Sequence, residues 1–270
     1  MGDDICGMIV SKIQGGLANQ IFQWAYGYCL SKKYNQKYYL DVSFFLGGCK
    51  GCTPRTFDLP YFKNIDINLF EGDVVKDFFS EKAFQITDPN RYEPSLPIDP
   101  LNFNILLDGF WQSELYFIDY RDDILNLLEF EDNPKFKSFD FKNSCSLHVR
   151  RTDYLNAPKF HTNLDISYYD KCLENLNHNG PIYVFSDDVN WCRNTLKYPN
   201  IHFMEGNSNT EDLKLMSLCE HNIIANSSFS WWAAWLNKNP EKKVFAPYHW
   251  FGPEGPGYGD IIPNSWIKIL

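Results

Sequence analysis

The sequence predicts an α/β protein with two Rossmann-like, doubly wound domains, in which parallel strands alternate with helices. Three observations lead to this prediction. Short apolar runs alternate with longer stretches of helical periodicity, clusters of Gly and Pro separate them, and the alternation occurs on both sides of a polar, aromatic-rich stretch at 130–143. The expected domains are therefore residues 1–140 and 141–270, and the second is the more regular.

The first domain opens with a βαβ unit. The strand Met8–Ile13 is followed by two glycines at 15–16 and by a helix over 17–29, whose apolar residues recur every three or four positions. A second strand at Lys37–Asp41 follows at once, so the glycine turn is expected at the carboxyl-end edge of a parallel sheet. Six prolines interrupt residues 53–104, where loops, short helices and one more strand are expected.

The second domain shows five predicted strands in a regular alternation with helices. Its first helix is expected from about Ser167 to Asn177, because Asn179-Gly180-Pro181 supplies a helix stop. Ligands of such folds bind at the carboxyl ends of the strands. The predicted strands are 144–149, 182–185, 201–204, 222–225 and 244–246, and the later helices begin near Val189, Thr210 and Ser228.

The composition restricts the class of partner. The chain has 270 residues, a formal net charge of −9 and a pI near 5.1, which disfavours a nucleic-acid binder that relies on a basic face. Hydrophobic residues make up 44% and aromatic residues 17%, as in a folded globular protein. Any anionic ligand must therefore be held by a local basic cluster.

The N-terminal residues carry acids where a signal peptide has basic residues, and no run approaches the ~20 apolar residues of a membrane span. A cytoplasmic protein is expected. Its eight cysteines are mostly isolated and are expected to be reduced core residues. Cys49 and Cys52 could form half of a zinc site, but no second ligand pair has matching spacing, so no metal site is predicted.

The most informative motif is His148-Val149-Arg150-Arg151-Thr152-Asp153-Tyr154, which directly follows a predicted strand. Arginine presents a rigid, permanently charged fork that matches phosphate oxygens in pairs. In an acidic protein, two arginines at a strand end indicate an anion site, and a diphosphate is the leading candidate. The alternative is that both arginines form surface ion pairs.

Two further strand ends carry polar clusters that would lie on the same edge. Asp187 and Asp188 follow the strand at 182–185, where they could accept hydrogen bonds from a guanine edge or cap the next helix. Ser227 and Ser228 begin a helix whose N-terminus could bind phosphate. The alternative there is an ordinary cap followed by a core helix, in which three tryptophans pack.

In the first domain, the glycine turn includes Gly16 and is followed by Asn19 and Gln20, which can donate hydrogen bonds to phosphate or sugar oxygens. It is neither the GxGxxG fingerprint nor a P-loop. The segment from Phe110 to Tyr116 offers Trp111, Gln112 and Glu114 as an acceptor surface for a sugar, although core packing is the alternative for its rings.

Three segments together resemble the α-1,2-fucosyltransferases, glycosyltransferase family 11. These are Gly15-Gly16-Leu17-Ala18-Asn19-Gln20-Ile21-Phe22-Gln23, the His148–Tyr154 motif and Asn226-Ser227-Ser228-Phe229-Ser230-Trp231-Trp232, in matching order and spacing from near the start of the chain to about Trp235. The family commonly has Gly where this chain has Thr152, as in related α-1,6 and protein O-fucosyltransferase motifs. Thr152 therefore makes the α-1,2 position of the transferred fucose a less specific expectation than fucosyl transfer itself.

The resemblance implies a GT-B-like architecture of two facing domains and inverting, metal-independent transfer from GDP-fucose, the donor substrate, to the 2-hydroxyl of a β-galactoside. No cofactor is implied. The acceptor would be a free or a lipid-linked glycan, and the latter would bring the protein to the inner membrane surface. Another GDP-sugar or fucosyl linkage is the alternative reaction, and a non-catalytic carbohydrate-binding protein is the alternative class.

The resemblance also implies residue roles. Arg150 would clamp the β-phosphate, His148 would lie beside the guanosine, and Asp187 or Asp188 would hold the guanine. Ser227 or Ser228 would hold the phosphate. From the residues themselves, Arg151 is a further predicted donor-binding residue, and Gly16, Asn19 and Gln20 are expected to face the donor if the two domains oppose each other.

Asp153 is the first candidate for a catalytic base, three residues beyond Arg150. The alternative is that it orients the Arg150 fork. Glu114, Asp41 and His161 are further candidate bases.

Overall fold

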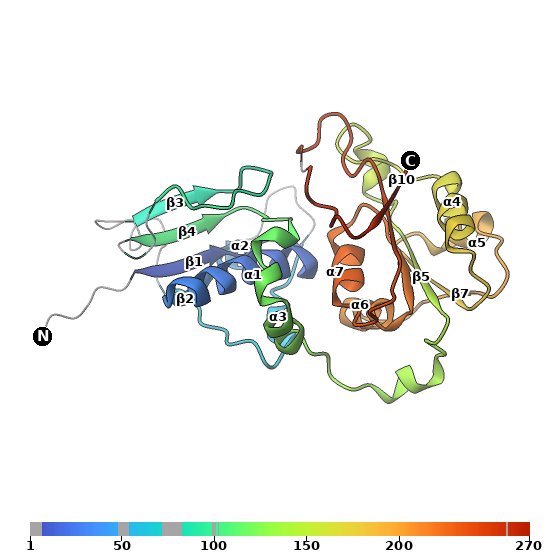
Figure 1. The fold of residues 1–270 in the computed structure, drawn as a ribbon, viewed down its shortest axis with the longest axis horizontal. Helices are drawn as coiled ribbons and strands as arrows, with labels where there is room; N and C mark the ends of the chain where they lie inside the picture. Colours follow the sequence, from blue (N-terminus) through green and yellow to red (C-terminus); the bar gives the residue numbers. More distant parts are fainter. Residues whose placement is uncertain (1–6, 48–53, 72–82, 99–100, 102, 258) are drawn as a thin grey trace, which may run out of the picture. The chain divides into compact units, whose positions relative to one another are not determined.

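The chain forms two compact units in a computed structural model (Figure 1). Unit 1 comprises residues 1–131 with 258–261, and unit 2 comprises 132–257 with 262–270. The chain thus changes unit after Glu131, whereas the sequence predicts a domain boundary after 140. The structure describes residues 7–47, 54–71, 83–98, 101, 103–257 and 259–270. Cys49 and Cys52 lie outside these residues.

Unit 1 contains a parallel sheet with the strand order β2-β1-β4-β3. The central strands are β1 (Met8–Lys12) and β4 (Asn104–Asp108), and the edges are β2 (Lys37–Asp41) and β3 (Ala83–Thr87). The βαβ unit predicted at the start of the chain is confirmed, with α1 (Leu17–Tyr34) as its helix. Among the described residues of 53–104, β3 is the extra strand that the sequence predicts, whereas β4, which begins at Asn104, is not predicted.

The helix α1 packs very closely against its sheet. A Cβ atom at Gly27 would lie 2.3 Å from the Ser11 hydroxyl oxygen and 2.4 Å from the Tyr38 ring, so only glycine fits there. The Tyr38 hydroxyl lies 3.0 Å from both the Ser11 Oγ and the Trp24 carbonyl oxygen. This contact joins β1, β2 and the middle of α1, so it holds the helix against the sheet.

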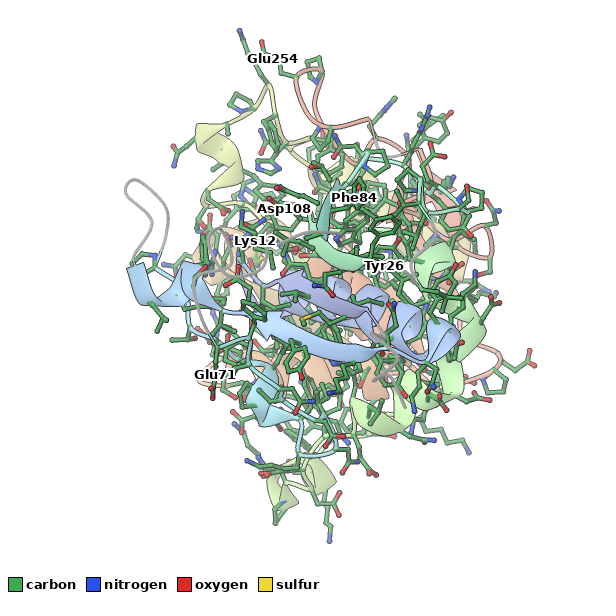
Figure 2. All side chains as sticks on the ribbon, turned by 90° about the vertical axis from the view of Figure 1, so that its left-hand side faces the viewer. Lys12, Tyr26, Glu71, Phe84, Asp108 and Glu254 are labelled. Carbon is green, nitrogen blue, oxygen red and sulfur yellow. The ribbon has the colours of Figure 1, made fainter. Side chains whose placement is uncertain are left out.

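The carboxyl-end edge of this sheet is tied by an ion pair. Lys12 Nζ lies 3.1 Å from Asp108 Oδ2, and both side chains meet where β1 and β4 end (Figure 2). Gln85 of β3 donates to the same carboxylate at 2.9 Å. The other helices in the described part of unit 1 are short: α2 (Ser43–Gly47), η1 (Leu59–Tyr61), η4 (Glu114–Tyr116), η5 (Ile118–Tyr120) and α3 (Arg121–Leu127).

Unit 2 contains a six-stranded parallel sheet with the order β10-β9-β8-β5-β6-β7. All five predicted strands are present, and β10 is an additional one. Every residue of the central strand β5 is buried, as expected of a parallel strand covered on both faces. The strands are β5 (Cys145–Val149), β6 (Ile182–Ser186), β7 (Ile201–Phe203), β8 (His221–Ile223), β9 (Val244–Pro247) and β10 (Ile267–Ile269).

The helices of unit 2 begin within one residue of the predicted positions, and side chains cap them. Ser208 and Glu211 form a reciprocal capping box at the start of α6. Asn177 adopts the left-handed conformation (φ 52°) that ends α4. The elements are η6 (Pro134–Ser138), η7 (Tyr154–Asn156), α4 (Ile166–Leu176), α5 (Val189–Thr195), α6 (Asn209–Leu218) and α7 (Ser228–Leu236).

Two expectations about the interior can be compared with the described residues. Five cysteines, at 29, 145, 172, 192 and 219, are buried and unpaired, as expected of reduced core residues. Among the helices that the structure describes, none is long and apolar enough to cross a membrane.

A buried amide network surrounds Asn222 in β8, an interior strand of the unit 2 sheet. Asn222 is fully buried, and its amide donates to the Ser146 hydroxyl at 2.7 Å and to the Met216 carbonyl at 2.8 Å. It also accepts a hydrogen bond from Asn237 at 2.8 Å. The network joins β8, β5, α6 and the end of α7 through one side chain.

We expect Asn222→Ala to lower the free energy of unfolding of unit 2 by about 2–4 kcal/mol, because three buried polar groups lose a partner. Urea unfolding followed by tryptophan fluorescence measures this change. Asn175→Ala on the exposed face of α4 is the matched control, with an expected change within about 0.5 kcal/mol. Equal midpoints for the two variants would show that the network contributes nothing.

Candidate active site

Three polar clusters converge on one edge of the unit 2 sheet. The strands β8, β5 and β6 are neighbours and all run parallel, so their carboxyl ends meet at the same edge. These ends lead into Asn226–Ser228, Arg150–Asp153 and Asp187–Asp188 respectively. The predicted common rim of the three clusters is therefore confirmed, and β5 lies at its centre.

Arg150 is held by carboxylates on two sides. Its Nη2 atom lies 2.6 Å from Asp153 Oδ2, and its Nε atom lies 3.4 Å from Asp187 Oδ2. Its guanidinium also lies 5.6 Å from the centre of the Tyr154 ring. The side chain is 27% exposed, so its charge stays within reach of a ligand while its position is restrained. Arg150 therefore forms the ion pairs that the alternative prediction describes, and its guanidinium is still accessible to a ligand.

Asp187 shapes the turn that carries the arginines. Its carboxylate accepts hydrogen bonds from the backbone N–H groups of Arg151 (2.9 Å) and Thr152 (3.1 Å) and from the Thr152 hydroxyl (2.5 Å). Together with the Arg150 contact, these bonds engage both carboxylate oxygens. Asp187 therefore positions the turn after β5, which leaves it little capacity to hold a guanine.

Asp188 and Arg151 are engaged with α5. Asp188 caps this helix by accepting from the Trp191 backbone N–H at 3.0 Å, so the capping alternative is confirmed for this residue. Arg151 stacks on the Trp191 ring, with 4.0 Å from its guanidinium carbon to the ring centre. Its Nε atom lies 3.5 Å from Asp188 Oδ2. Arg151 therefore faces α5, and its side chain is less exposed than that of Arg150.

His148 is buried in β5 and bridges to α7. Its Nδ1 atom lies 2.8 Å from the Ser230 hydroxyl oxygen. Burial, with the nearby charge of Arg150, lowers the pKa of His148 to about 3. The imidazole is therefore neutral near pH 7 and carries both a donor and an acceptor nitrogen.

The N-terminus of α7 combines a cap with a buried tryptophan cluster. Ser227 accepts a hydrogen bond from the Phe229 backbone N–H at 3.3 Å, whereas Ser228, the first helical residue, is only partly buried. The alternative of a capped core helix is confirmed for Ser227 and for the three buried rings. Ser228 is the more accessible hydroxyl. The buried rings are Trp231, Trp232 and Trp235.

Tyr154 connects the arginine turn to the neighbouring strand end. Its hydroxyl donates to the Asn226 carbonyl at 2.9 Å, and its ring stacks on His161 with centroids 3.8 Å apart. Asp153 is exposed on the other side of Arg150. Burial raises the pKa of Asp153, but the hydrogen bond and charge of Arg150 outweigh it and leave the pKa below its usual value. This carboxylate is a weak proton acceptor.

The glycine turn of unit 1 uses its side chains mainly to hold loops together. Gly15 adopts φ +79°, which glycine accommodates readily. Asn19 accepts a hydrogen bond from Gln112 at 3.0 Å, so two predicted site residues meet. Gln20 is fully buried and donates to the Gly15 and Thr56 carbonyls at 2.9 and 2.8 Å. Gln20 is therefore not accessible to the donor substrate, and its expected binding role is corrected to a structural one.

The predicted acceptor residue Trp111 is part of the core. Its side chain is 2% exposed and packs on the Tyr26 ring, with centroids 4.7 Å apart. Its backbone adopts φ +54°, a strained conformation for a bulky residue. Asp88 supports this bend by accepting from the Phe110 and Trp111 N–H groups at 3.0 and 2.7 Å. Trp111 cannot stack on a sugar here, whereas Gln112 remains accessible.

Sequence reasoning missed Asp88, Ser230 and Arg55. Asp88 follows β3 in a proline-rich stretch. Ser230 lies within α7, whereas the predicted phosphate contacts are the two serines at the start of that helix. Arg55 lies beside the glycine turn, because its Nη1 atom is 3.8 Å from where a Cβ of Gly16 would be. Its only sequence signal is a basic residue after Pro54. The candidate base Asp41 is buried and accepts from the Ser43 N–H at 3.0 Å.

Metal ligands do not gather in this site. Within the described ranges, no group of three His, Cys, Asp or Glu side chains is arranged to hold a metal ion. The charged groups at the ends of β5 and β6 are two arginines and three carboxylates: Arg150 pairs with Asp153 and Asp187, and Arg151 pairs with Asp188.

Comparison with known proteins defines the class of this α/β protein as a glycosyltransferase with a GT-B-like fold. The family model described as glycosyl transferase family 11 matches residues 13–254. The chain belongs to this family.

Two curated relatives match almost the whole chain. The O-antigen biosynthesis glycosyltransferase WbnK of Escherichia coli is 31% identical and covers 96% of this chain and 99% of its own. An alpha-1,2-colitosyltransferase of Escherichia coli is 30% identical, and the match covers 97% of this chain and 99% of that protein. Among solved structures, the R284K mutant of Arabidopsis thaliana FUT1 in complex with GDP has a TM-score of 0.50 and 12% identity, covering 92% of this chain and 72% of that one. It shows the fold alone.

The neutral state of His148 predicts a pH-dependent stability. The folded pKa lies below the value of about 6.5 in the unfolded chain, so the unfolded chain binds an extra proton at low pH. The stabilising contribution is complete above pH 6.5 and decreases as the pH falls toward about 3.

Between pH 7 and 5, we expect wild-type protein to lose about 2 kcal/mol more unfolding free energy than His148→Gln, which cannot titrate. Urea midpoints of both proteins at the two pH values measure the difference. Glutamine keeps a polar group facing Ser230. Parallel losses in the two proteins would mean that His148 is already protonated or is solvated in the folded state.

Proposed function

We propose that this enzyme transfers L-fucose from GDP-fucose to the 2-hydroxyl of a β-galactoside, with inversion and without a metal ion. The observation that carries the proposal is the accessible Arg150 fork at the end of the central strand β5, fixed from both sides by Asp153 and Asp187. Family membership supports glycosyl transfer. An alpha-1,2 linkage appears in the name of a relative that matches the whole length.

The chemistry requires that negative charge on the leaving group be stabilised. The acceptor oxygen forms a bond to the anomeric carbon from one face while the bond to the β-phosphate oxygen breaks on the other, and GDP departs. Arg150 balances the charge that develops on this diphosphate. A donor fixed before the reaction needs no reorganisation, which makes such electrostatic stabilisation the largest catalytic effect in many enzymes.

The surrounding groups suit a nucleotide diphosphate. Ser228 and the free N–H groups at the start of α7 provide further donors for phosphate oxygens. The neutral imidazole of His148 remains a predicted neighbour of the guanosine, and it adds no charge there. Gly16 and Asn19 of unit 1 remain predicted donor contacts, and Gln112 and Glu114 remain predicted acceptor contacts.

Asp153 is better suited to orient Arg150 than to remove a proton. Its carboxylate is bonded to the guanidinium at 2.6 Å, and its pKa stays below the usual value. A transition state that is strongly dissociative needs little help from a base, so the acceptor proton can pass to solvent as the new bond forms.

A second donor is favoured by one comparison. The relative named alpha-1,2-colitosyltransferase matches 97% of this chain, and colitose is the 3-deoxy form of fucose. A panel of GDP-fucose, GDP-colitose and GDP-mannose with lactose as acceptor, followed by NMR assignment of the product linkage, decides between the donors. Activity with GDP-mannose alone would overturn both candidates.

We expect Arg150→Ala to lower kcat with GDP-fucose by about 100-fold or more, because the leaving diphosphate loses its fixed positive partner. Arg150→Lys should restore only part of the rate, since lysine lacks the planar fork. Steady-state kinetics with lactose measure both effects.

Arg193→Ala is the matched control, because Arg193 is exposed on α5 and pairs with Glu205 away from the strand ends. Its kcat should stay within about twofold of wild type, as for a surface ion pair. Near-full kcat in a correctly folded Arg150→Ala protein would contradict the proposed role.

For Asp153→Asn we expect GDP binding to weaken about threefold to tenfold, on the scale of one charge-assisted hydrogen bond, because Arg150 loses an orienting partner. The acidic limb of the pH–rate profile should remain. Calorimetry of GDP binding and the pH dependence of kcat separate the two roles: unchanged GDP affinity with loss of the acidic limb would identify Asp153 as the base.

A further inference from the structure

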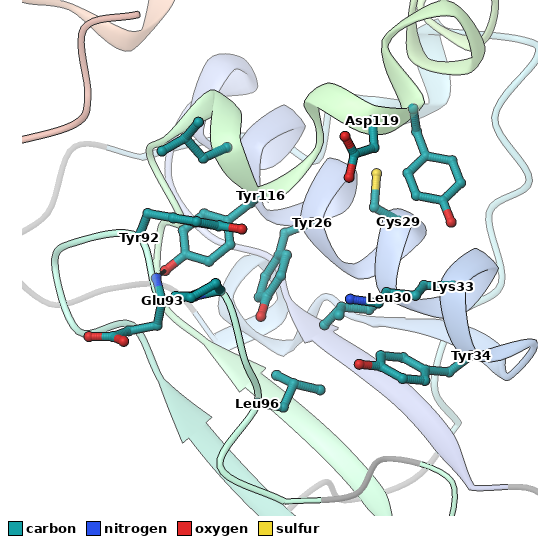
Figure 3. A pocket seen from close by; sticks show the side chains of 13 residues that line it. Tyr26, Cys29, Leu30, Lys33, Tyr34, Tyr92, Glu93, Leu96, Tyr116 and Asp119 are labelled. Atoms are coloured by element: carbon teal, nitrogen blue, oxygen red, sulfur yellow. Dashed lines mark hydrogen bonds between the residues drawn. The ribbon is translucent and has the colours of Figure 1, made fainter.

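A tyrosine-rich pocket in unit 1 shares no lining residue with the proposed donor contacts. It is formed by one face of α1, the chain after β3, and η4 with η5 (Figure 3). The space between its walls and at its open mouth is about 510 Å³, a volume that includes open solvent. Five phenol rings line it: Tyr26, Tyr34, Tyr92, Tyr116 and Tyr120.

Tyr26 supplies a hydroxyl that lacks a partner. The side chain is only 5% exposed, and its ring packs on Tyr116 with centroids 4.5 Å apart. Among the described residues, no group forms a hydrogen bond with its hydroxyl, which points into the pocket (Figure 3). Burial raises the pKa of Tyr26, so the hydroxyl stays protonated. Because the pocket is open, this hydroxyl can donate to water or to a ligand that displaces the water.

The walls of the pocket are already fixed. The Tyr116 hydroxyl donates to the Arg91 carbonyl at 2.7 Å and accepts from the Glu93 N–H at 3.3 Å. The Tyr92 N–H donates to Asp260 Oδ2 at 2.7 Å. These bonds hold the chain after β3 against η4, so a ligand would meet a preorganised surface and lose less entropy in ordering it.

The chemistry of the lining suits a neutral sugar ring. Tyrosine rings offer flat apolar faces with polar ends, which match a pyranose that has apolar C–H faces and hydroxyl edges. Asp119 and Glu93 bring two carboxylates that accept hydroxyl hydrogen bonds, and Lys33 brings one ammonium group. Two carboxylates disfavour a phosphate, and this density of polar groups disfavours an alkyl chain.

The pocket is close in the chain to a predicted acceptor contact. Leu115 and Tyr116 of the pocket wall follow Gln112 by three and four residues, a reach of at most roughly 10–14 Å. Gln112 itself bonds to Asn19 at the start of α1. An oligosaccharide whose terminal sugar lies near Gln112 could therefore extend along this segment.

We propose that this pocket binds a neutral sugar unit of the acceptor oligosaccharide, beyond the residue that receives fucose. The proposal rests on the proposed function for the identity of the reaction, but the binding step can be tested without turnover. It makes Tyr26 a specificity-determining residue for longer acceptors.

The test compares lactose with a neutral tetrasaccharide that ends in β-galactose, using GDP-fucose as donor. Tyr26→Phe removes only the hydroxyl and keeps the ring packing. We expect the ratio of the tetrasaccharide KM to the lactose KM to rise about threefold to tenfold, the effect of one lost hydrogen bond. Tyr28→Phe, on the same helix but outside the pocket lining, is the matched control and should leave this ratio unchanged. An unchanged ratio in Tyr26→Phe overturns the proposal.

A binding measurement distinguishes failure of the pocket from failure of the proposed reaction. Saturation-transfer NMR records tetrasaccharide binding to the wild-type protein without donor, and then to Asp119→Asn, an exposed site where folding is not at risk. Weaker saturation in the variant supports the pocket even if GDP-fucose proves to be the wrong donor. Absence of binding to wild type, or equal saturation in both proteins, overturns the pocket whatever the donor is.

Discussion

The carboxylate of Asp187 accepts hydrogen bonds from two successive backbone amides and a hydroxyl, and it also faces Arg150. Through these bonds, a residue that directly follows β6 determines the shape of the turn that follows β5. In a chain of net charge −9, acidic side chains thus hold the two arginines of this site in place. Arg150 consequently has a defined position before any ligand arrives, which lowers the entropy lost on binding.

The parallel sheet explains why distant motifs meet. The strands β8, β5 and β6 are neighbours although other elements separate them in sequence, and parallel connections return every strand end to the same edge. Buried strands then supply rigid supports: β5 is buried throughout, and His148 within it is tied to α7 through Ser230. The helix α7 in turn is fixed by its buried tryptophans.

The sequence was sufficient to predict the strands of unit 2, because each is a short apolar run bounded by turn residues. It was also sufficient to predict the common rim, since the rule for parallel sheets needs only strand directions. It could not assign Gln20 and Trp111 correctly, because burial depends on which chains pack over them. Likewise, β10 has three residues, two of them exposed, and shows too little alternation to identify. The role of Asp187 depends on backbone groups, which no sequence motif displays.

Residues 259–261 belong to unit 1 although the chain around them belongs to unit 2. In this segment, the Asp260 carboxylate accepts a hydrogen bond from the Tyr92 N–H, and the Asp260 carbonyl accepts one from the Ser113 hydroxyl. The segments of the two units therefore alternate along the amino-acid sequence. A fragment cut after Glu131 would lack the residue that secures two of its own loops, so dissection of this enzyme for separate expression requires grafting that short peptide back onto the N-terminal piece.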